Sequence, residues 1–164
     1  MITMDDITGS AYERFIDYAL AHTDAFMFVG CNYYNSRIYK THVKRFIKEL
    51  QPYAIKRRHD PQWPGTVQAG TDRYQRTIYF YRSDPNAAAV LKSAGRIFGW
   101  VYPYYPEDLA FFRQGYCWMA SVAHEEYLWF YRETKEDLTF FRSLGVLEMP
   151  KSIRIRKTVI MKAD

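Results

Sequence analysis

The sequence predicts an α+β fold in which a mainly antiparallel sheet carries helices packed on one face. Short aromatic and β-branched runs alternate with amphipathic stretches along the chain. Three of these runs, Leu109–Arg113, Tyr116–Ser121 and Tyr127–Arg132, follow one another with compact polar breaks, which predicts a C-terminal three-stranded meander. Gln114 and Gly115 fill the first break, and Gly supplies the positive φ that a tight hairpin turn requires.

Length and composition predict one globular domain over residues 1–164. The chain is 48% hydrophobic and 25% charged, and it is long enough to bury its own core. No run approaches the roughly 18 apolar residues that cross a bilayer, and the acidic N-terminus lacks the pattern of a signal peptide. We therefore expect a cytoplasmic protein. Cys31 and Cys117 belong to no ligand-spaced pattern, so we expect reduced thiols, no metal and no cofactor.

Two helices are predicted in the N-terminal third. Ser10 and Glu13 form the pattern of a capping box, and apolar residues recur after them at helical spacing. The second helix is predicted from Arg37 to about Gln51, with Asn35 or Ser36 as its cap. Six residues form its predicted buried stripe: Ile38, Tyr39, Val43, Phe46, Ile47 and Leu50.

The remaining strands are predicted from short runs between breaks. Ala25–Cys31 and Thr77–Arg82 are apolar or aromatic runs of strand length, and Ile97–Tyr102 is similar but contains a glycine. Residues 54–76 show no sustained period and predict a long loop. Ile153–Met161 begins with alternating basic and apolar residues, a pattern typical of an edge strand.

Two further helices have clear start or stop signals. Asp84 precedes a proline, which predicts a capped helix over Asn86–Ala94. Thr134 predicts the cap of a last helix over Lys135–Leu144, and Gly145 then stands in the position that ends it.

Basic residues concentrate between positions 37 and 58 of a chain whose net charge is +5. Four of them recur at i, i+3, i+7 and i+11 and so line one exposed face of the predicted second helix. Such a row can bind the phosphates of a nucleic acid or a carboxylate-rich protein, although a solvated helix face is the commoner outcome. The candidate nucleic-acid contacts are Arg37, Lys40, Lys44, Lys48, Arg57 and Arg58.

The connection between the last two meander strands places His124 beside Glu125 and Glu126. A histidine steered by a carboxylate can act as a general base, so these residues are the candidates for catalysis. The zinc motif HExxH is incomplete because Leu128 stands where its second histidine must be. A structural hydrogen bond or a partner contact are the other roles open to His124. No nucleophile elbow, phosphate loop or dinucleotide fingerprint is present.

Recognition by another protein is the leading expectation, because the chain is rich in the residue types that dominate protein interfaces. It contains 15 Tyr and 4 Trp. The candidate partner contacts are Trp63, Trp100, Tyr104, Tyr105, Arg113, His124 and Glu125. Trp63 has the alternative role of pinning its loop to the core. Arg113 has the alternative role of pairing with a carboxylate such as Glu107 or Asp108.

Several motifs together resemble a widespread group of small uncharacterised bacterial domains. The shared features are the turn Trp63-Pro64-Gly65-Thr66, the segment Pro106–Arg113 that matches PEDLxFxR, the glycine turn at Gly115, and Ala123-His124-Glu125. The resemblance covers roughly residues 63–140 and implies a fold rather than an activity. The chain is also loosely similar to the SMI1/KNR4-like immunity domains, which are small cytoplasmic α+β proteins that bind and neutralise a toxin.

These observations favour a cytoplasmic bacterial protein-binding module, of which an immunity-type inhibitor is one form. The first alternative is nucleic-acid binding through the basic 37–58 face. The second is an enzyme that uses His124 as its general base.

Overall fold

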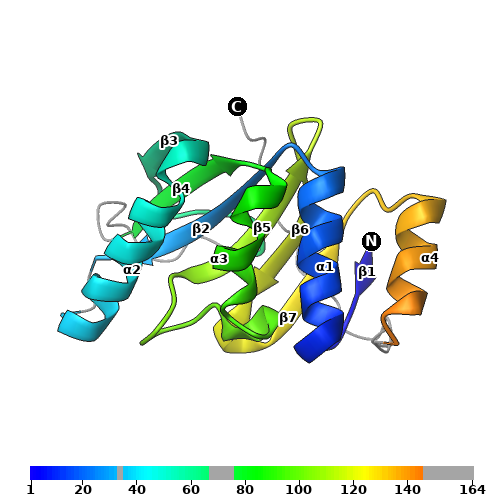
Figure 1. Ribbon diagram of the computed structural model, residues 1–164, viewed down its shortest axis with the longest axis horizontal. Coiled ribbons are helices and arrows are strands. Elements are labelled where there is room, and N and C mark those ends of the chain that lie inside the picture. The colour runs from blue at the N-terminus through cyan, green and yellow to red at the C-terminus, as the bar shows by residue number, and fades with distance from the viewer. Residues whose placement is uncertain (33–34, 67–75, 146–164) are drawn as a thin grey trace.

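The computed structural model describes residues 1–32, 35–66 and 76–145, which form one seven-stranded sheet with four α-helices (Figure 1). The strand order is β1-β7-β6-β5-β2-β4-β3, and every pairing is antiparallel. The strands are β1 (Ile2–Thr3), β2 (Ala25–Cys31), β3 (Ala54–His59), β4 (Arg76–Arg82), β5 (Glu107–Arg113), β6 (Tyr116–Val122) and β7 (Tyr127–Phe130). The predicted α+β class and the β5-β6-β7 meander are confirmed.

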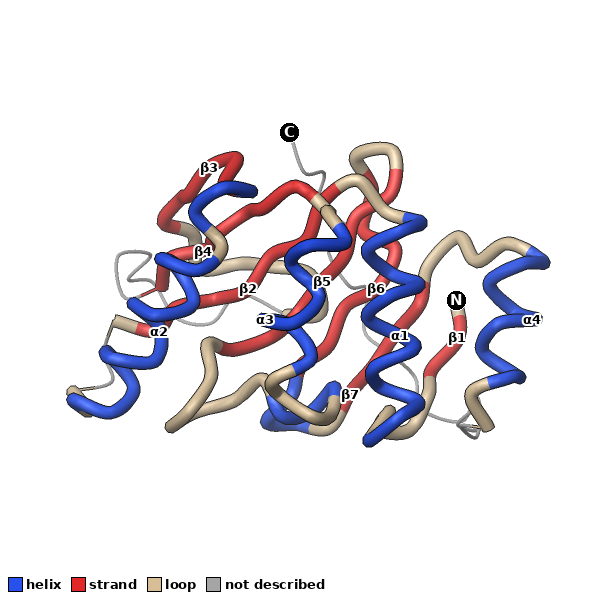
Figure 2. The backbone as a smooth tube through the Cα atoms, in the orientation of Figure 1, coloured by secondary structure: helices blue, strands red, loops and turns tan. Residues whose placement is uncertain are grey.

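The helices are α1 (Gly9–His22), α2 (Arg37–Glu49), α3 (Ala88–Lys92) and α4 (Lys135–Ser143). Figures 1 and 2 show α1, α2 and α3 lying over one face of the sheet, with α4 beyond β1. Phe15 of α1 stacks on Trp118 of β6 with ring centroids 6.2 Å apart, and Phe141 of α4 lies 4.3 Å from the ring of Phe130. These aromatic contacts join both helices to the same core.

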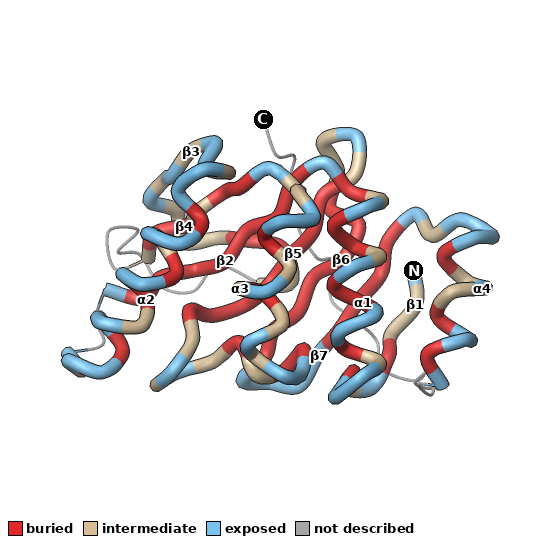
Figure 3. Tube along the Cα trace, viewed as in Figure 1, coloured by how far each residue is buried: buried red, intermediate tan, exposed pale blue. Residues whose placement is uncertain are grey.

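The opposite face of the sheet carries a second apolar cluster. Met27 and Val29 of β2 belong to it, whereas Phe26 and Phe28 face the helices. All four side chains are buried, so β2 is covered on both faces, as its place in the middle of the sheet requires (Figure 3). This explains why its sequence is an unbroken apolar run rather than an alternating one.

The start of α1 differs from the prediction. The residue before the helix is Thr8, and no side chain caps it, so the capping box of Ser10 and Glu13 is wrong. Tertiary contacts set the helix entry instead, because Thr8 bridges to Arg96 and the Gly9 N–H donates to the Gly95 carbonyl at 3.1 Å. The cap of α2 is confirmed at Ser36.

Two backbone predictions in the middle of the chain are wrong. The first part of the predicted 54–76 loop is β3, which pairs with β4 at the edge of the sheet. Its side chains are largely exposed, so it lacks the apolar signal of a strand. Ile97–Gly99 forms a 3-10 turn rather than a strand, and this run is apolar because Ile97 and Phe98 are buried in the core.

Three helix start and stop signals in the second half of the chain are confirmed. Thr134 caps α4, and Asp137 completes a capping box with it. Gly145 has a φ of 70°, as the end of a helix requires. Asp84 accepts a hydrogen bond from the Asn86 N–H at 2.9 Å, and the predicted helix is a 3-10 turn followed by α3. The predicted strand Ile153–Met161 lies outside the described residues.

Candidate functional site

Three of the sequence motifs converge on one buried carboxylate, that of Asp108 at the start of β5. The Trp63 Nε1–H donates to Oδ2 at 2.8 Å, and the Ala123 N–H donates to Oδ1 at 2.9 Å. Gly65 fits against the same region, since a Cβ at this position would lie 2.9 Å from the Val122 side chain. The WPGT turn, the PEDL strand and the AHE turn therefore form a single clasp around Asp108.

The Asp108 clasp has a structural role rather than a catalytic one. The side chain of Asp108 is fully buried, and burial raises its pKa to about 7. The two N–H donors and the nearby His124 oppose that rise, whereas the charge of Glu107 adds to it. Asp108 also has a φ of 54°, a conformation that Asp tolerates better than most residues. A carboxyl enclosed in this way holds two turns together without access to a substrate.

Trp63 and Trp100 are core residues, so their prediction as partner contacts is wrong, whereas the alternative role of Trp63 in pinning its loop to the core is confirmed. Trp63 is 3% exposed and Trp100 is fully buried. The Trp100 Nε1–H donates to the Tyr12 hydroxyl at 2.9 Å, and that hydroxyl donates to the Leu91 carbonyl at 2.8 Å. Both indole N–H groups have internal acceptors, which is how large aromatic side chains are accommodated in a core. Tyr105 is half-buried, and its hydroxyl donates to the Ser93 carbonyl.

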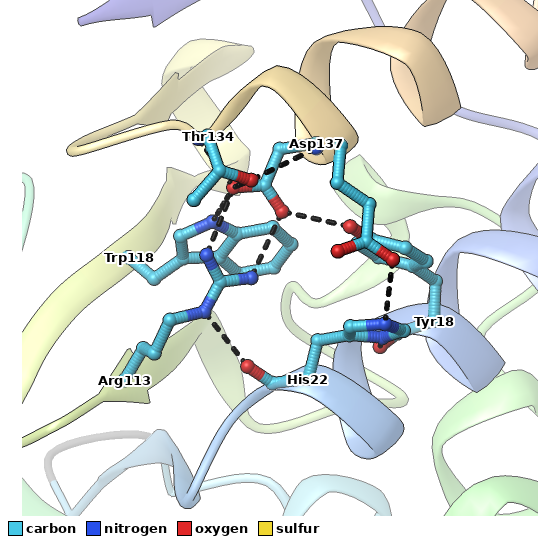
Figure 4. Close-up of polar contacts among 7 residues, drawn as sticks. Tyr18, His22, Arg113, Trp118, Thr134 and Asp137 are labelled. Atoms are coloured by element: carbon cyan, nitrogen blue, oxygen red, sulfur yellow. Dashed lines mark hydrogen bonds and ion pairs between the residues drawn. The ribbon is translucent and has the colours of Figure 1, made fainter.

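Arg113 is also occupied inside the fold. Its guanidinium donates to both carboxylate oxygens of Asp137 at 2.8 Å, and its Nε–H donates to the His22 carbonyl at 2.8 Å (Figure 4). A carboxylate partner was the alternative prediction for Arg113, but the partner is Asp137 of α4 rather than Glu107 or Asp108. This pair connects β5 to α1 and α4, so it stabilises the packing of three elements.

Asp137 collects further donors in the same network. The Tyr18 hydroxyl donates at 2.9 Å, the Trp118 Nε1–H at 3.3 Å, and both the N–H and the hydroxyl of Thr134 also donate to it (Figure 4). Burial opposes its ionisation, but the hydrogen bonds from Arg113, Thr134 and Tyr18 outweigh burial and hold the pKa of Asp137 well below its ordinary value. The sequence signal for this residue was its position three after the Thr134 cap.

His124 and Glu125 lie on the surface, in the short 3-10 turn Ala123–Glu125. Their side chains are 51% and 56% exposed, and His124 Nε2 lies 3.7 Å from a Glu125 carboxylate oxygen. This is the geometry of a solvated ion pair, which contributes little to stability. Both side chains are accessible to a partner. The described residues contain no group of three His, Cys, Asp or Glu side chains that could hold a metal ion.

The basic row of α2 is exposed along its length, as predicted. Within the described ranges no carboxylate pairs with Arg37, Lys44, Lys48 or Arg57. Lys40 donates to Asn35 Oδ1 at 2.9 Å. Arg58 differs from the rest because it is partly buried and its Nε lies 3.5 Å from Asp60 Oδ2. Most of the positive charge of this region is therefore available to a partner.

The aromatic connector before β5 lies against the same helix. Tyr104 is 57% exposed, and its ring packs edge-on against the ring of His42 with the ring centroids 5.8 Å apart. Tyr102 is 39% exposed and lies 5.6 Å from the ring of Tyr39. Ile38 is 53% exposed, so its assignment to the buried stripe is wrong. The fold thus places exposed tyrosines beside a basic helix that is far away in the sequence.

Comparisons with known proteins add no family to this description. No protein-family model matches the chain, and neither a curated protein nor a solved structure matches it. None of the described helices is long and apolar enough to cross a membrane. Function is therefore inferred from the chemistry of the surface.

Proposed function

We propose that this chain is a protein-binding module that docks an acidic partner protein on the outer side of α2 and the adjoining connector. We call this area the α2 surface. Its members are exposed and come from two parts of the chain: Ile38, Lys48, Tyr102 and Tyr104. The observation that carries the proposal is the juxtaposition of exposed tyrosine and isoleucine side chains with cations that no described carboxylate neutralises.

The exposed apolar side chains are concentrated near this helix. Ile38, Tyr102 and Tyr104, which lie on or against α2, are three of the six large hydrophobic side chains that are exposed among the described residues. Tyrosine brings a large contact area and a polar group, and apolar contacts of this kind supply most of the affinity at a protein interface. The surrounding cations accelerate encounter with a negatively charged surface and set its orientation.

An aliphatic side chain favours a protein over a nucleic acid as the partner. Phosphates are bound by cations, and bases stack on aromatic rings, but an exposed isoleucine such as Ile38 contributes to neither contact. The nucleic-acid alternative uses the same basic helix and predicts an affinity that falls steeply with salt. Docking through apolar contacts predicts a complex that survives high salt.

An immunity-type inhibitor is one form of such a module, and in that case the acidic partner is the toxin. Action in the cytoplasm is part of this proposal. It is supported by Cys31 and Cys117, which are buried thiols that are not joined in a disulfide.

Site-specific photo-crosslinking tests the proposal. A photoreactive amino acid is placed at position 104 or 48 of the full chain, which is expressed in the cells that encode it. Matched controls carry the same amino acid at position 127, an exposed tyrosine on β7, or at position 135, an exposed lysine on α4. We expect one acidic protein to be linked from positions 104 and 48 only. Adducts to nucleic acid, or the same adducts from all four positions, would contradict the proposal.

A further inference from the structure

A pocket lies on one flank of α2, away from the connector. It is lined by Asn35, Arg37, Lys40, Thr41 and Lys44. We propose that this pocket binds a phosphomonoester group in its dianionic form. The inference goes beyond the protein-docking function and stands whether or not an acidic partner is found.

The pocket and the exposed tyrosines of the α2 surface use different flanks of the helix, whereas Lys48, at i+4 from Lys44, lies on the same flank as the pocket. Residues 37, 40 and 44 follow one another at i, i+3 and i+7, so their side chains share one flank. The opposite flank carries His42, whose ring contacts Tyr104. Figure 1 shows α2 at the end of the molecule where β3 and β4 form the sheet edge. The cations therefore converge on one pocket rather than encircling the helix.

Hydrogen bonds within the pocket identify its free donors. Asn35 Oδ1 accepts from Lys40 Nζ at 2.9 Å, which positions that ammonium and leaves the Asn35 amide NH₂ to donate. The Thr41 hydroxyl donates to the Arg37 carbonyl at 2.8 Å, so it lines the wall without offering its proton. The remaining donors are the Arg37 guanidinium, the Lys44 ammonium and the other N–H bonds of Lys40. All of them favour an anion with several acceptor oxygens.

Three full positive charges share this pocket, and none of its described lining residues is acidic. In the described part of the chain, neither Arg37 nor Lys44 forms an ion pair. Like charges held in one site repel each other, so a bound anion relieves a repulsion as well as forming new hydrogen bonds.

A further cation lies on the neighbouring strand. Arg57 of β3 pairs in register with Tyr79 of β4, and its charge opposes the rise in the Tyr79 pKa that burial causes. The Tyr79 ring is adjacent to α2, because a Cβ built on Gly30 would lie 3.0 Å from this ring and 3.7 Å from the Val43 side chain. Arg57 therefore adds positive potential on the side of α2 that faces the sheet edge.

The charge and shape of the pocket select a phosphomonoester over other anions. A monoester carries about −1.5 to −2 charges at neutral pH and three terminal oxygens, which match three cations and an amide. A carboxylate has one charge and two oxygens. A phosphodiester backbone has one charge per group, and it is bound best by cations spread along a track rather than gathered in one pocket.

Titration of the full chain with phenyl phosphate tests the proposal. Binding is followed by the backbone amide shifts of residues 35–44 in an NMR spectrum, with sodium chloride at matched ionic strength as the blank. We expect Arg37→Gln and Lys44→Gln each to weaken binding at least about fivefold, the loss of a charge-assisted hydrogen bond. Lys135→Gln is the matched control, because it removes the same charge from an exposed lysine of α4 that does not line the pocket. It is expected to leave the affinity unchanged.

Three results would overturn the proposal. The first is a response to phenyl phosphate no larger than the response to chloride. The second is an equal loss of affinity in Lys135→Gln, which would indicate non-specific charge attraction. The third is tighter binding of a short oligothymidylate through the same residues, which would assign the pocket to a phosphodiester backbone. Because position 104 lies on the other flank of α2, cross-linking there does not use the pocket, and the two proposals fail independently.

Discussion

Asp108 and Asp137 are both fully buried carboxylates, yet their surroundings shift their pKa values in opposite directions. Asp108 receives two hydrogen bonds, both from uncharged N–H groups. Asp137 receives both arms of the Arg113 guanidinium together with donors from Tyr18, Trp118 and Thr134. Burial raises the pKa of Asp108 to about 7, whereas the pKa of Asp137 stays well below its ordinary value.

The difference shows that the donors around a buried acid decide its role: Asp137 has a guanidinium partner, more hydrogen bonds and a shallower position than Asp108. Asp137 is an ionised hub that joins α1, α4, β5 and β6. Asp108 is a weak acid that joins two turns, and its ionisation near neutral pH works against burial. The predictions below test this contrast in order of decreasing effect.

Removal of the Asp137 carboxylate is expected to have the largest effect. Asp137→Ala leaves the Arg113 guanidinium half-buried without its anion, and the free energy of unfolding should fall by about 3–5 kcal/mol. Urea unfolding at pH 7 measures it. Glu136→Ala is the matched control, because Glu136 is the neighbouring acid and its side chain is 72% exposed. If Asp137→Ala lowers the free energy of unfolding by less than about 1 kcal/mol, Asp137 is not the stabilising hub that distinguishes it from Asp108.

The two acids should also give opposite pH dependences. The pKa of Asp108 is raised on folding, so its contribution to stability is present below about pH 4 and is lost as the pH rises to about 7. Its upper limit is about 4 kcal/mol, from roughly 1.4 kcal/mol per pKa unit. The pKa of Asp137 is lowered on folding, so its contribution is present above about pH 4 and is lost in more acidic solution.

Asp108→Asn isolates the first of these dependences. Asparagine tolerates the positive φ at this position and carries no charge, so the variant should lose the decline in stability between about pH 4 and pH 7. Urea unfolding of both proteins from pH 4.5 to pH 8 measures the difference. If the two unfolding free energies run parallel over this range, Asp108 is ionised throughout and the raised pKa is refuted.

The same tryptophan substitution should act unequally in the two networks. Trp63→Phe removes one of the two donors to Asp108 and should raise its pKa by up to roughly one unit, as expected for a hydrogen bond worth about 1 kcal/mol. Trp118→Phe removes a longer bond of 3.3 Å from Asp137, which keeps Arg113, Tyr18 and Thr134. The carboxyl ¹³C chemical shifts of Asp108 and Asp137, followed as a function of pH, measure the change in each pKa. A larger change in the pKa of Asp137 than in the pKa of Asp108 would contradict this prediction.

The exposed pair beside the clasp should matter least. His124→Ala removes a solvated contact of 3.7 Å to Glu125 and is expected to change the unfolding free energy by less than about 0.5 kcal/mol. Thermal or urea unfolding at pH 7 checks this. A loss above about 1 kcal/mol would show that the His124 side chain is needed to stabilise the Asp108 clasp.

Parts of this architecture were predictable because their signals are local. The meander was recognisable from strand runs and from Gly115, and α4 from Thr134 and Gly145. The basic face of α2 followed from helical spacing, since a periodic row of charges must point to one side. These features depend on residues a few positions apart. At that distance the local backbone geometry alone determines which side chains are adjacent.

Long-range contacts settled the rest. Strand β3 forms only because β4 offers it a ladder, and α1 begins where Thr8 meets Arg96 rather than at its own capping pattern. Trp63 and Trp100 have the composition of interface residues, but distant acceptors, Asp108 and Tyr12, place them in the core.

The candidate sites divide in the same way. The types of side chain able to bind an acidic partner were visible in the printed chain, whereas the meeting of Tyr104 with α2 depends on the path of the chain through the sheet. The physical reason is that hydrophobic burial and hydrogen bonding are satisfied by whichever groups the fold brings together. Composition and local spacing determine which chemistry is present, and packing determines which of it faces solvent.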